Sequence, residues 1–354
     1  MKKKDLLKKI LLLTATIILF LVLLELSLRI YNQVFFENEL AYYMNSSNYN
    51  PKDLQGKSFN GLGPLIRPSP YHDIIFEFKP NLNVTYINGT VITNSLGWRD
   101  KLYTIKKPEK TIRIVGLGDS VMFGRGVNQG ENYLNLLEQK LNEKYPEFKW
   151  EILNFALPAY NTAMELAVLK NYALEYDPDI IIYGYVGNDG CLPDFIVQKD
   201  SFFSTKSAIY EYLSSLYNKA TFIFKTTDIT SSWNICKEED APEEYDNMVG
   251  VEAIRRSLGK ISNISFENNI SLIFFHGTEW SFELGNPRGK PIKYVVSAAD
   301  YFDEENLTKE KMWLNPEDGH PSVYGHKIYS ETLFRYLNDS GIINKLENKY
   351  ESKK

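Results

Sequence analysis

The sequence predicts a three-layer α/β/α fold with a mainly parallel sheet, preceded by one N-terminal transmembrane helix. From residue 109 to about residue 340, short apolar segments alternate with segments of helical periodicity. Strands that are apolar along their whole length are typical of a parallel sheet that helices cover on both faces. In such sheets ligands bind beyond the carboxyl ends of the strands, so the turns that follow the strands are the expected place of a functional site.

Composition sets the broad class of protein. The chain has 354 residues, of which 44% are hydrophobic, which is enough for a full α/β core. A net charge of −5 argues against a nucleic-acid binder. Cys191 and Cys236 lack metal-ligand spacing, and one disulfide bond between them is compatible with the sequence. No metal or nucleotide motif is present, so neither a metal nor a cofactor is expected.

The N-terminus carries a targeting signal. Residues 1–9 are a basic tail with five lysines, and residues 10–29 form an apolar segment long enough to approach a membrane span. No small-residue cleavage site follows, which favours a retained signal anchor over the alternatives, a cleaved signal peptide or a helix on the lipid surface. Because the positive flank stays inside, the rest of the chain is expected outside the cytoplasm of a single-pass membrane protein.

Residues 30–108 lack helical periodicity and are rich in Asn, Tyr, Pro and Gly. We expect an irregular stalk or cap with a few short strands, for example within residues 83–93. The segment ends in a turn, residues 93–100, that contains Trp98 and Arg99. A packing role is the simpler interpretation of that turn.

The domain from 109 to 340 is read in order as alternating elements. Expected strands cover residues 112–115, 150–155, 179–185 and 270–275, and expected helices cover residues 131–144, 162–176, 249–268 and the stretch after His320 to residue 337. An insertion at about 191–247 interrupts this alternation. Its residues 207–217 look amphipathic, which fits a core-packed helix, a lid or a membrane-facing flap. Residues 341–354 are read as a charged C-terminal tail.

Four turns at strand ends carry the residue types of acyl-transfer chemistry. Ser120 follows Gly118 and Asp119 at a strand-to-helix turn, and Asn188 lies in a glycine-flanked turn. A serine nucleophile needs a base to accept its proton, and His320 is the candidate. Asp318, two residues before it, can orient the imidazole, with Glu317 as a competing acid. His326, one turn into the last helix, is interpreted as structural.

In order and separation, these turns resemble the blocks of the SGNH/GDSL hydrolase superfamily, and the chain is most similar to its membrane-anchored bacterial branch. The resemblance covers about residues 90–340 and includes residues 94–99 and 124–127. It implies a flavodoxin-like sandwich with Ser120 as nucleophile, His320 as base and Asp318 as orienting acid. It also implies an oxyanion hole of Ser120 N–H, Ala159 N–H and the Asn188 side chain.

Two positions of the second block depart from the pattern of this family, and one of them is Ala156, which replaces a frequent glycine. Ala159 stands where the family normally has glycine, so we expect its N–H to serve only if its φ is negative. The spacing of Asp318 and His320 is similar to that of polysaccharide O-acetyltransferase relatives.

The favoured function is an extracytoplasmic serine esterase or deacylase. It would cleave O-acyl esters, acetyl above all, on glycan, lipid or cell-wall substrates. An O-acyltransferase that modifies a surface polysaccharide, with a membrane partner as acyl donor, is the alternative, since these residues do not choose between water and a sugar hydroxyl as acceptor. A catalytically inactive glycan-binding protein on the same fold is the third hypothesis.

Overall fold

The computed structural model describes residues 3–45, 50–193, 196, 207–210, 212–213, 241–277, 295–315 and 318–351. The chain forms two compact units. One unit consists of Met1–Tyr42 and Phe195–Asn234, and the other of Tyr43–Asp194 and Ile235–Lys354. Glu317, Cys236 and most of the predicted insertion lie outside the described residues.

The larger unit is built on a five-stranded parallel sheet in the order β10-β9-β8-β6-β7. Its strands are β6 (Thr111–Gly118), β7 (Lys149–Asn154), β8 (Ile180–Gly184), β9 (Ser271–Phe275) and β10 (Val295–Val296). If these five strands are numbered 1 to 5 along the chain, the sheet read from β7 has the order 2-1-3-4-5, which is that of flavodoxin-like folds. The predicted fold class is therefore confirmed, and every residue of the central strand β6 is buried.

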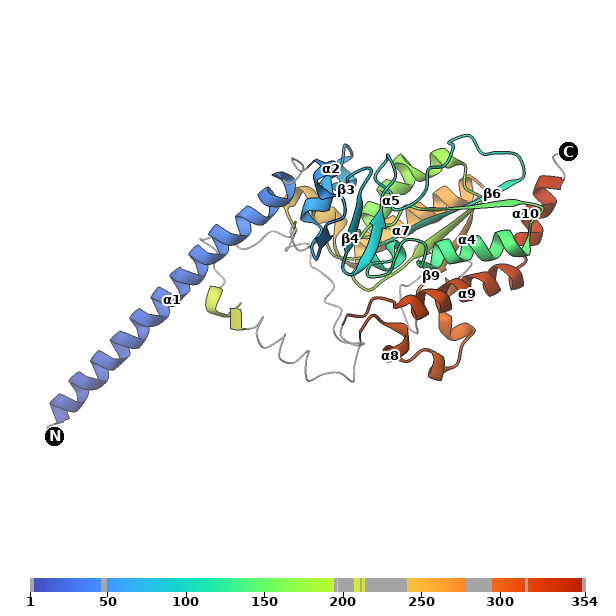
Figure 1. The fold of residues 1–354 in the computed structure, drawn as a ribbon. Coiled ribbons are helices and arrows are strands. Elements are labelled where there is room, and N and C mark those ends of the chain that lie inside the picture. Colours follow the sequence, from blue (N-terminus) through green and yellow to red (C-terminus); the bar gives the residue numbers. More distant parts are fainter. Residues whose placement is uncertain are drawn as a thin grey trace. The chain divides into compact units, whose positions relative to one another are not determined.

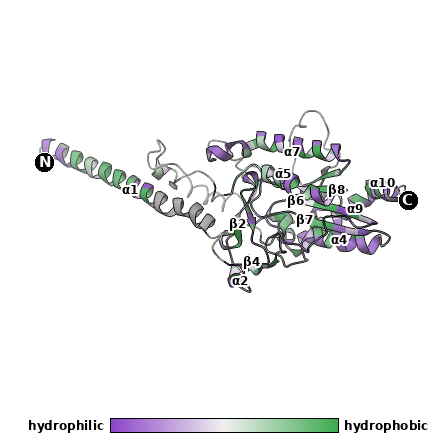
Figure 2. Ribbon diagram, turned by 90° about the horizontal axis from the view of Figure 1, so that it is seen from above, coloured by the Kyte–Doolittle hydropathy of each residue, from purple (hydrophilic) through white to green (hydrophobic). Residues whose placement is uncertain are grey.

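Helices cover both faces of this sheet (Figure 1). One layer contains α4 (Tyr133–Lys144) and α9 (Val323–Asp339), which pack against each other, and the other contains α5 (Thr162–Asn171) and α7 (Gly250–Glu267). Apolar residues gather in the sheet and hydrophilic ones on the outer faces of α4 and α7 (Figure 2). The helix predicted over residues 162–176 is shorter, because a 3₁₀ turn, Ala173–Tyr176, follows α5.

Residues 50–100 form small sheets that belong to the larger unit. Strands β1 (Ser58–Phe59), β4 (Asn83–Tyr86) and β5 (Gly89–Ile92) make one sheet, and β2 (Ile66–Pro68) and β3 (Phe76–Phe78) make another; a single helical turn, α2 (Pro51–Leu54), precedes them. Buried Tyr160 donates its hydroxyl to the Phe76 carbonyl at 2.8 Å. The predicted boundary at residue 108 therefore does not separate two compact units.

The N-terminal helix α1 (Lys3–Asn45) is longer than predicted. Residues 30–45 were expected to be irregular, yet they continue the helix, and they contain neither proline nor glycine to interrupt it. Within α1, Lys8–Tyr31 is long and apolar enough to cross a membrane. Near the end of this span, Glu25 accepts hydrogen bonds from the Ala208 and Ile209 N–H groups, so part of the insertion belongs with α1 rather than with the sheet.

The C-terminal segment is a packed helix and not the charged tail that the sequence indicates. Helix α10 (Ile342–Glu351) buries Ile342, Ile343 and Leu346. Near its end, Lys349 and Tyr350 both bond to the carboxylate of Asp179, which is fully buried just before β8. Buried apolar residues at three positions of one helical face explain the packing, because they must be removed from water.

Asp179 joins several segments at the amino ends of the strands. Its carboxylate accepts hydrogen bonds from the Arg113 N–H at 3.0 Å and from Lys107 Nζ at 2.9 Å, in addition to those from α10. Burial alone raises the pKa of this carboxyl, but Lys107, the Arg113 N–H and Lys349 outweigh burial and lower it. The Lys107 side chain is itself only 9% exposed, and Asp179 is its closest anionic partner.

We expect Asp179→Asn to lower the free energy of unfolding by about 3 kcal/mol, because it leaves buried Lys107 without its closest anionic partner. Urea denaturation of the two proteins measures the difference. The matched control is Asp177→Asn, which removes a carboxylate that also pairs with Lys107 but is 82% exposed. It should cost less than about 0.5 kcal/mol, and equal losses in both variants would contradict the role given to Asp179.

Candidate active site

Ser120 lies just after the end of β6 and is the first residue of the helix that follows. The Asp119 carboxylate caps the short helix α3 (Ser120–Phe123) by accepting the Val121 N–H at 2.9 Å, and Gly124 ends it in a left-handed conformation. Ser120 is buried, with 7% of its surface exposed. The strand-to-helix position predicted for Ser120 is therefore observed.

The structure brings together the three residues predicted for the chemistry. Ser120 Oγ is 2.8 Å from His320 Nε2, and His320 Nδ1 is 2.5 Å from Asp318 Oδ1. Ser120 Oγ also lies 3.2 Å from Asp119 Oδ2. A hydroxyl has one proton to donate, and the shorter contact favours the bond to His320.

Asp318 is held as a carboxylate. Its hydrogen bond with His320 and the nearby charge of Arg125 lower the pKa to about 2, although partial burial opposes them. An ionised Asp318 can accept a hydrogen bond from Nδ1–H of His320, which leaves Nε2 unprotonated and able to accept the serine proton. Arg125 also contacts Asp318 and His320 directly, a feature that sequence reasoning missed.

Three donors are available near Ser120 for an oxyanion. The N–H groups of Ser120 and Ala159 have no hydrogen-bond acceptor among the described residues. The Asn188 side chain donates a hydrogen bond to the carboxylate of Asp119, the residue directly before Ser120. A primary amide has two N–H bonds, so one remains for a ligand.

Ala159 corrects one expectation. We expected its N–H to serve only with a negative φ, but φ is 68°, the left-handed conformation that glycine adopts readily. The alanine therefore keeps the backbone path of a glycine, at a strain of roughly 1 kcal/mol.

Buried Arg99 holds the loop that follows Ser120. Its two terminal nitrogens donate to the carbonyls of four residues, and Nε donates to the Gln129 side chain at 3.0 Å. The four carbonyls, at 2.6–2.8 Å, are those of Thr90, Phe123, Gly124 and Val127. Burial lowers the Arg99 pKa to about 9, so the group stays charged at neutral pH. The packing role expected for residues 93–100 fits this arrangement, in which buried Arg99 holds the loop after Ser120 through backbone carbonyls.

Further ionisable groups lie buried beneath the site. Glu165 and Asp189 are fully buried, and burial together with the charge of Asp119 raises both pKa values well above the usual range. Tyr183 donates to Asp189 at 2.9 Å. His326 is also fully buried, and burial lowers its pKa to about 3, which keeps it neutral against the Tyr133 ring. Its expected structural role fits this apolar setting.

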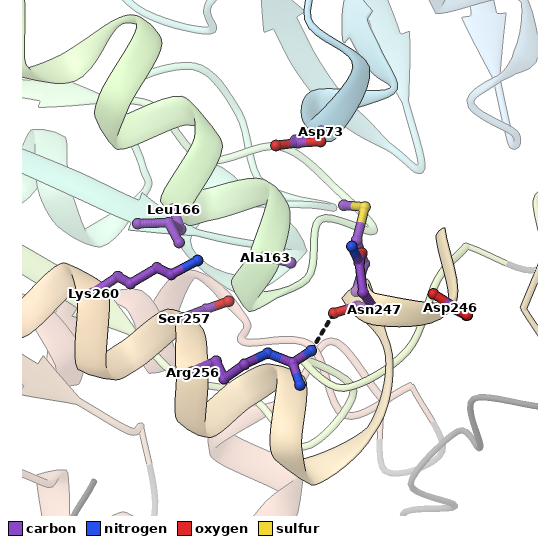
Figure 3. Close-up of a pocket in the computed structure, with 9 residues that line it drawn as sticks. Asp73, Ala163, Leu166, Asp246, Asn247, Arg256, Ser257 and Lys260 are labelled. Carbon is purple, nitrogen blue, oxygen red and sulfur yellow. Dashed lines mark hydrogen bonds between the residues drawn. The ribbon is translucent and has the colours of Figure 1, made fainter. Parts of the chain in front are cut away.

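A separate pocket of about 310 Å³ lies between α5 and α7 (Figure 3). Arg256 spans one side and donates to the Asn247 carbonyl at 2.6 Å. None of the three predicted chemical residues lines this pocket. Among the described residues, no group of three or more His, Cys, Asp or Glu side chains is placed to hold a metal ion.

The sheet order and the four turns agree with the SGNH/GDSL resemblance. No protein-family model matches the chain, and no curated protein matches it. Several solved structures match the chain. They include TesA (12% identity, 64% of this chain and 97% of the other, TM-score 0.37) and the psychrotrophic esterase EstA from Pseudoalteromonas sp. (12%, 64% and 97%, 0.38). A third is a catalytic mutant of Axe2, an acetylxylan esterase from Geobacillus stearothermophilus (14%, 64% and 94%, 0.37). These values are low, so the function of this chain is inferred from its own side chains.

We expect Arg99→Met to lower the free energy of unfolding by about 3–5 kcal/mol, because four carbonyls lose a buried donor. Thermal denaturation measures the loss. The control is Arg67→Met, whose guanidinium is 39% exposed and pairs with Glu77. A loss no larger than that of the control would contradict the supporting role of Arg99.

Ala159→Gly should leave ester turnover within about threefold of the parent, because glycine adopts the same φ without strain. Steady-state kinetics on an acetyl ester measures this. A larger fall in kcat would show that the methyl group itself contributes to the site.

Proposed function

We propose that this chain is a serine esterase of the SGNH/GDSL type that removes O-acyl groups outside the cytoplasm. The observation that carries the proposal is the continuous chain of contacts from Ser120 Oγ through His320 to Asp318 Oδ1. Acetyl esters on glycan, lipid or cell-wall material are the proposed substrates, because a single serine acyl-enzyme step handles a small acyl group without a cofactor.

In the proposed mechanism, Ser120 Oγ attacks the acyl carbonyl while its proton passes to His320 Nε2. The ionised Asp318 stabilises the imidazolium through Nδ1–H. Collapse of the tetrahedral intermediate breaks the ester C–O bond, and the departing alcohol takes the proton from Nε2. Water then repeats the sequence on the acyl-serine, which releases the carboxylic acid and restores Ser120.

Preorganised donors meet the charge that develops on the carbonyl oxygen. The Ser120 and Ala159 N–H groups and the second N–H of Asn188 are assigned to this oxyanion. Each is fixed before substrate arrives, Asn188 by its bond to Asp119. Fixed dipoles cost no reorganisation during the reaction, so they stabilise the transition state more than water would.

Two features support an extracytoplasmic, membrane-anchored location. The apolar span Lys8–Tyr31 follows a lysine-rich N-terminus. Positively charged flanks of a membrane span usually stay on the cytoplasmic side, which would place the rest of the chain outside. Cys191, in the larger unit, is disulfide-bonded. Structural disulfides form and persist in oxidising compartments.

Ser120→Ala and His320→Ala should each lower kcat by at least about 10³-fold on 4-nitrophenyl acetate without lowering the melting temperature, since neither side chain packs the core. The assay uses the full chain in detergent, with Ser340→Ala as the control substitution. A Ser120→Ala protein that keeps parental turnover would overturn the serine mechanism. A folded parent without turnover would favour a transferase or an inactive glycan-binding protein.

Asn188→Ala should reduce kcat about 10²- to 10³-fold, with a smaller effect on KM, because the amide acts on the oxyanion rather than on the ground-state carbonyl. Steady-state kinetics on the same ester separates the two parameters. A change below threefold in kcat would remove Asn188 from the proposed oxyanion hole.

A further inference from the structure

Arg125 places a guanidinium beside the base. It lies between Gly124 and Gly126, whose φ values of 85° and 84° give the loop a tight left-handed path. Its Nη1 is 2.7 Å from Asp318 Oδ1 and 2.6 Å from His320 Nδ1. The hydrolysis described above uses the imidazolium of His320 as its only cation. The Arg125 guanidinium beside it therefore needs another role.

Arg125 and Asp318 compete for the same nitrogen. In a neutral imidazole, Nδ1 either carries a proton and donates to Asp318, or lacks it and accepts from Arg125. In the second case the proton sits on Nε2, which faces Ser120 Oγ at 2.8 Å. A protonated Nε2 cannot accept the serine proton. The contact with Arg125 therefore favours a tautomer of His320 that is idle as a base.

Part of the Arg125 guanidinium remains open. Its described hydrogen bonds all come from Nη1, which leaves the N–H groups of Nη2 and Nε without an acceptor among the described residues. The side chain is 22% exposed, so a ligand can reach it. Planar guanidinium groups bind carboxylate and phosphate groups through two parallel N–H bonds.

We propose that Arg125 recognises an anionic group next to the scissile ester and that this contact releases His320 as a base. The anion binds Nη2 and Nε and draws Nη1 away from Nδ1. The single proton of neutral His320 then moves from Nε2 to Nδ1 through solvent water, and Nδ1–H donates a hydrogen bond to Asp318 alone. The substrates would be O-acyl esters of acidic molecules, with a carboxylate or phosphate near the acylated hydroxyl. This inference rests on the proposed esterase function and adds the charge class of its substrate.

The test compares matched sugars. Singly acetylated methyl glucuronide and methyl glucoside differ only in a carboxylate, and acetylated glucose 6-phosphate supplies the phosphate arm. Acetate release is measured with the full chain in detergent and normalised by the uncatalysed hydrolysis rate of each ester. We expect kcat/KM to be at least tenfold higher for one or both anionic sugars. The preferred anion identifies the source of the charge, and no preference for either anion would overturn the proposal.

Variants separate recognition from general damage. Arg125→Met should bring the ratio of anionic to neutral substrate close to one and should raise kcat on the neutral glucoside, because the competitor for Nδ1 is gone. Arg125→Lys should keep part of the preference, since it keeps the charge but not the planar pair of donors. The control is Arg255→Met, an exposed arginine on α7 that pairs with Glu252 and should keep the parental ratio. An unchanged ratio in Arg125→Met would refute the proposal.

A spectroscopic readout tests the tautomer directly. ¹⁵N NMR distinguishes protonated Nδ1 from protonated Nε2, and the chain has four histidines, so the His320 signals can be assigned by substitution. We expect a larger share of protonated Nδ1 in Arg125→Met than in the parent. The same distribution in both proteins would refute competition for Nδ1. Loss of the neutral 4-nitrophenyl acetate activity in Ser120→Ala tests the esterase function separately.

Discussion

The loop that carries Ser120, the proposed nucleophile, depends on one buried cation. All five N–H bonds of Arg99 meet acceptors. Four of these acceptors are main-chain carbonyls, from β5, from the last residue of α3 and from the segment after α3. A guanidinium is costly to bury, and it is tolerated here because every donor is satisfied. The small sheets before residue 100 are thereby joined to the turn that presents Ser120. This explains why they belong to the same compact unit.

The proposed catalytic residues and the Asp179 cluster lie at opposite ends of the strands of the parallel sheet. Ser120 and the turn with Asn188 follow the carboxyl ends of β6 and β8. Asp179, which ties α10 and Lys107 to the sheet, lies at the amino ends. A substitution in the Asp179 cluster can therefore lower the stability of the fold while turnover at Ser120 is kept. Arg99 and the buried acids Glu165 and Asp189 are exceptions, since they lie in the core near Asp119 and the loop after Ser120.

Much of the fold follows from local patterns. The apolar runs predicted β6, β7, β8 and β9 closely, and the four turns pointed to Ser120, His320 and Asp318, because strand ends on one edge must meet. Contacts between distant residues were not predictable in this way. Arg125 and Asp318 are 193 positions apart, and no periodicity relates them. The left-handed Ala159 was missed because its residue type argues against its φ.

Two expectations were wrong for a different reason. Residues 30–45 and 341–354 were judged by composition, as irregular and charged, but both contain helices. In α10 the deciding features are a few apolar residues and their spacing, which an abundance of lysine and glutamate obscures. In α1 a preceding apolar helix supplies the nucleus, so its continuation costs little.

The partners of Arg99 are all uncharged: four carbonyls and one amide oxygen. Acid weakens ion pairs by neutralising their carboxylates, and none of these contacts has a carboxylate to neutralise. The contacts of Arg99 around the proposed nucleophile are therefore insensitive to acidification. The contacts of Asp179, at the amino ends of the strands, are sensitive to it. Strong acid therefore weakens the contacts that tie α10 to Asp179, whereas the contacts that Arg99 makes to the loop after Ser120 contain no carboxylate that acid could neutralise.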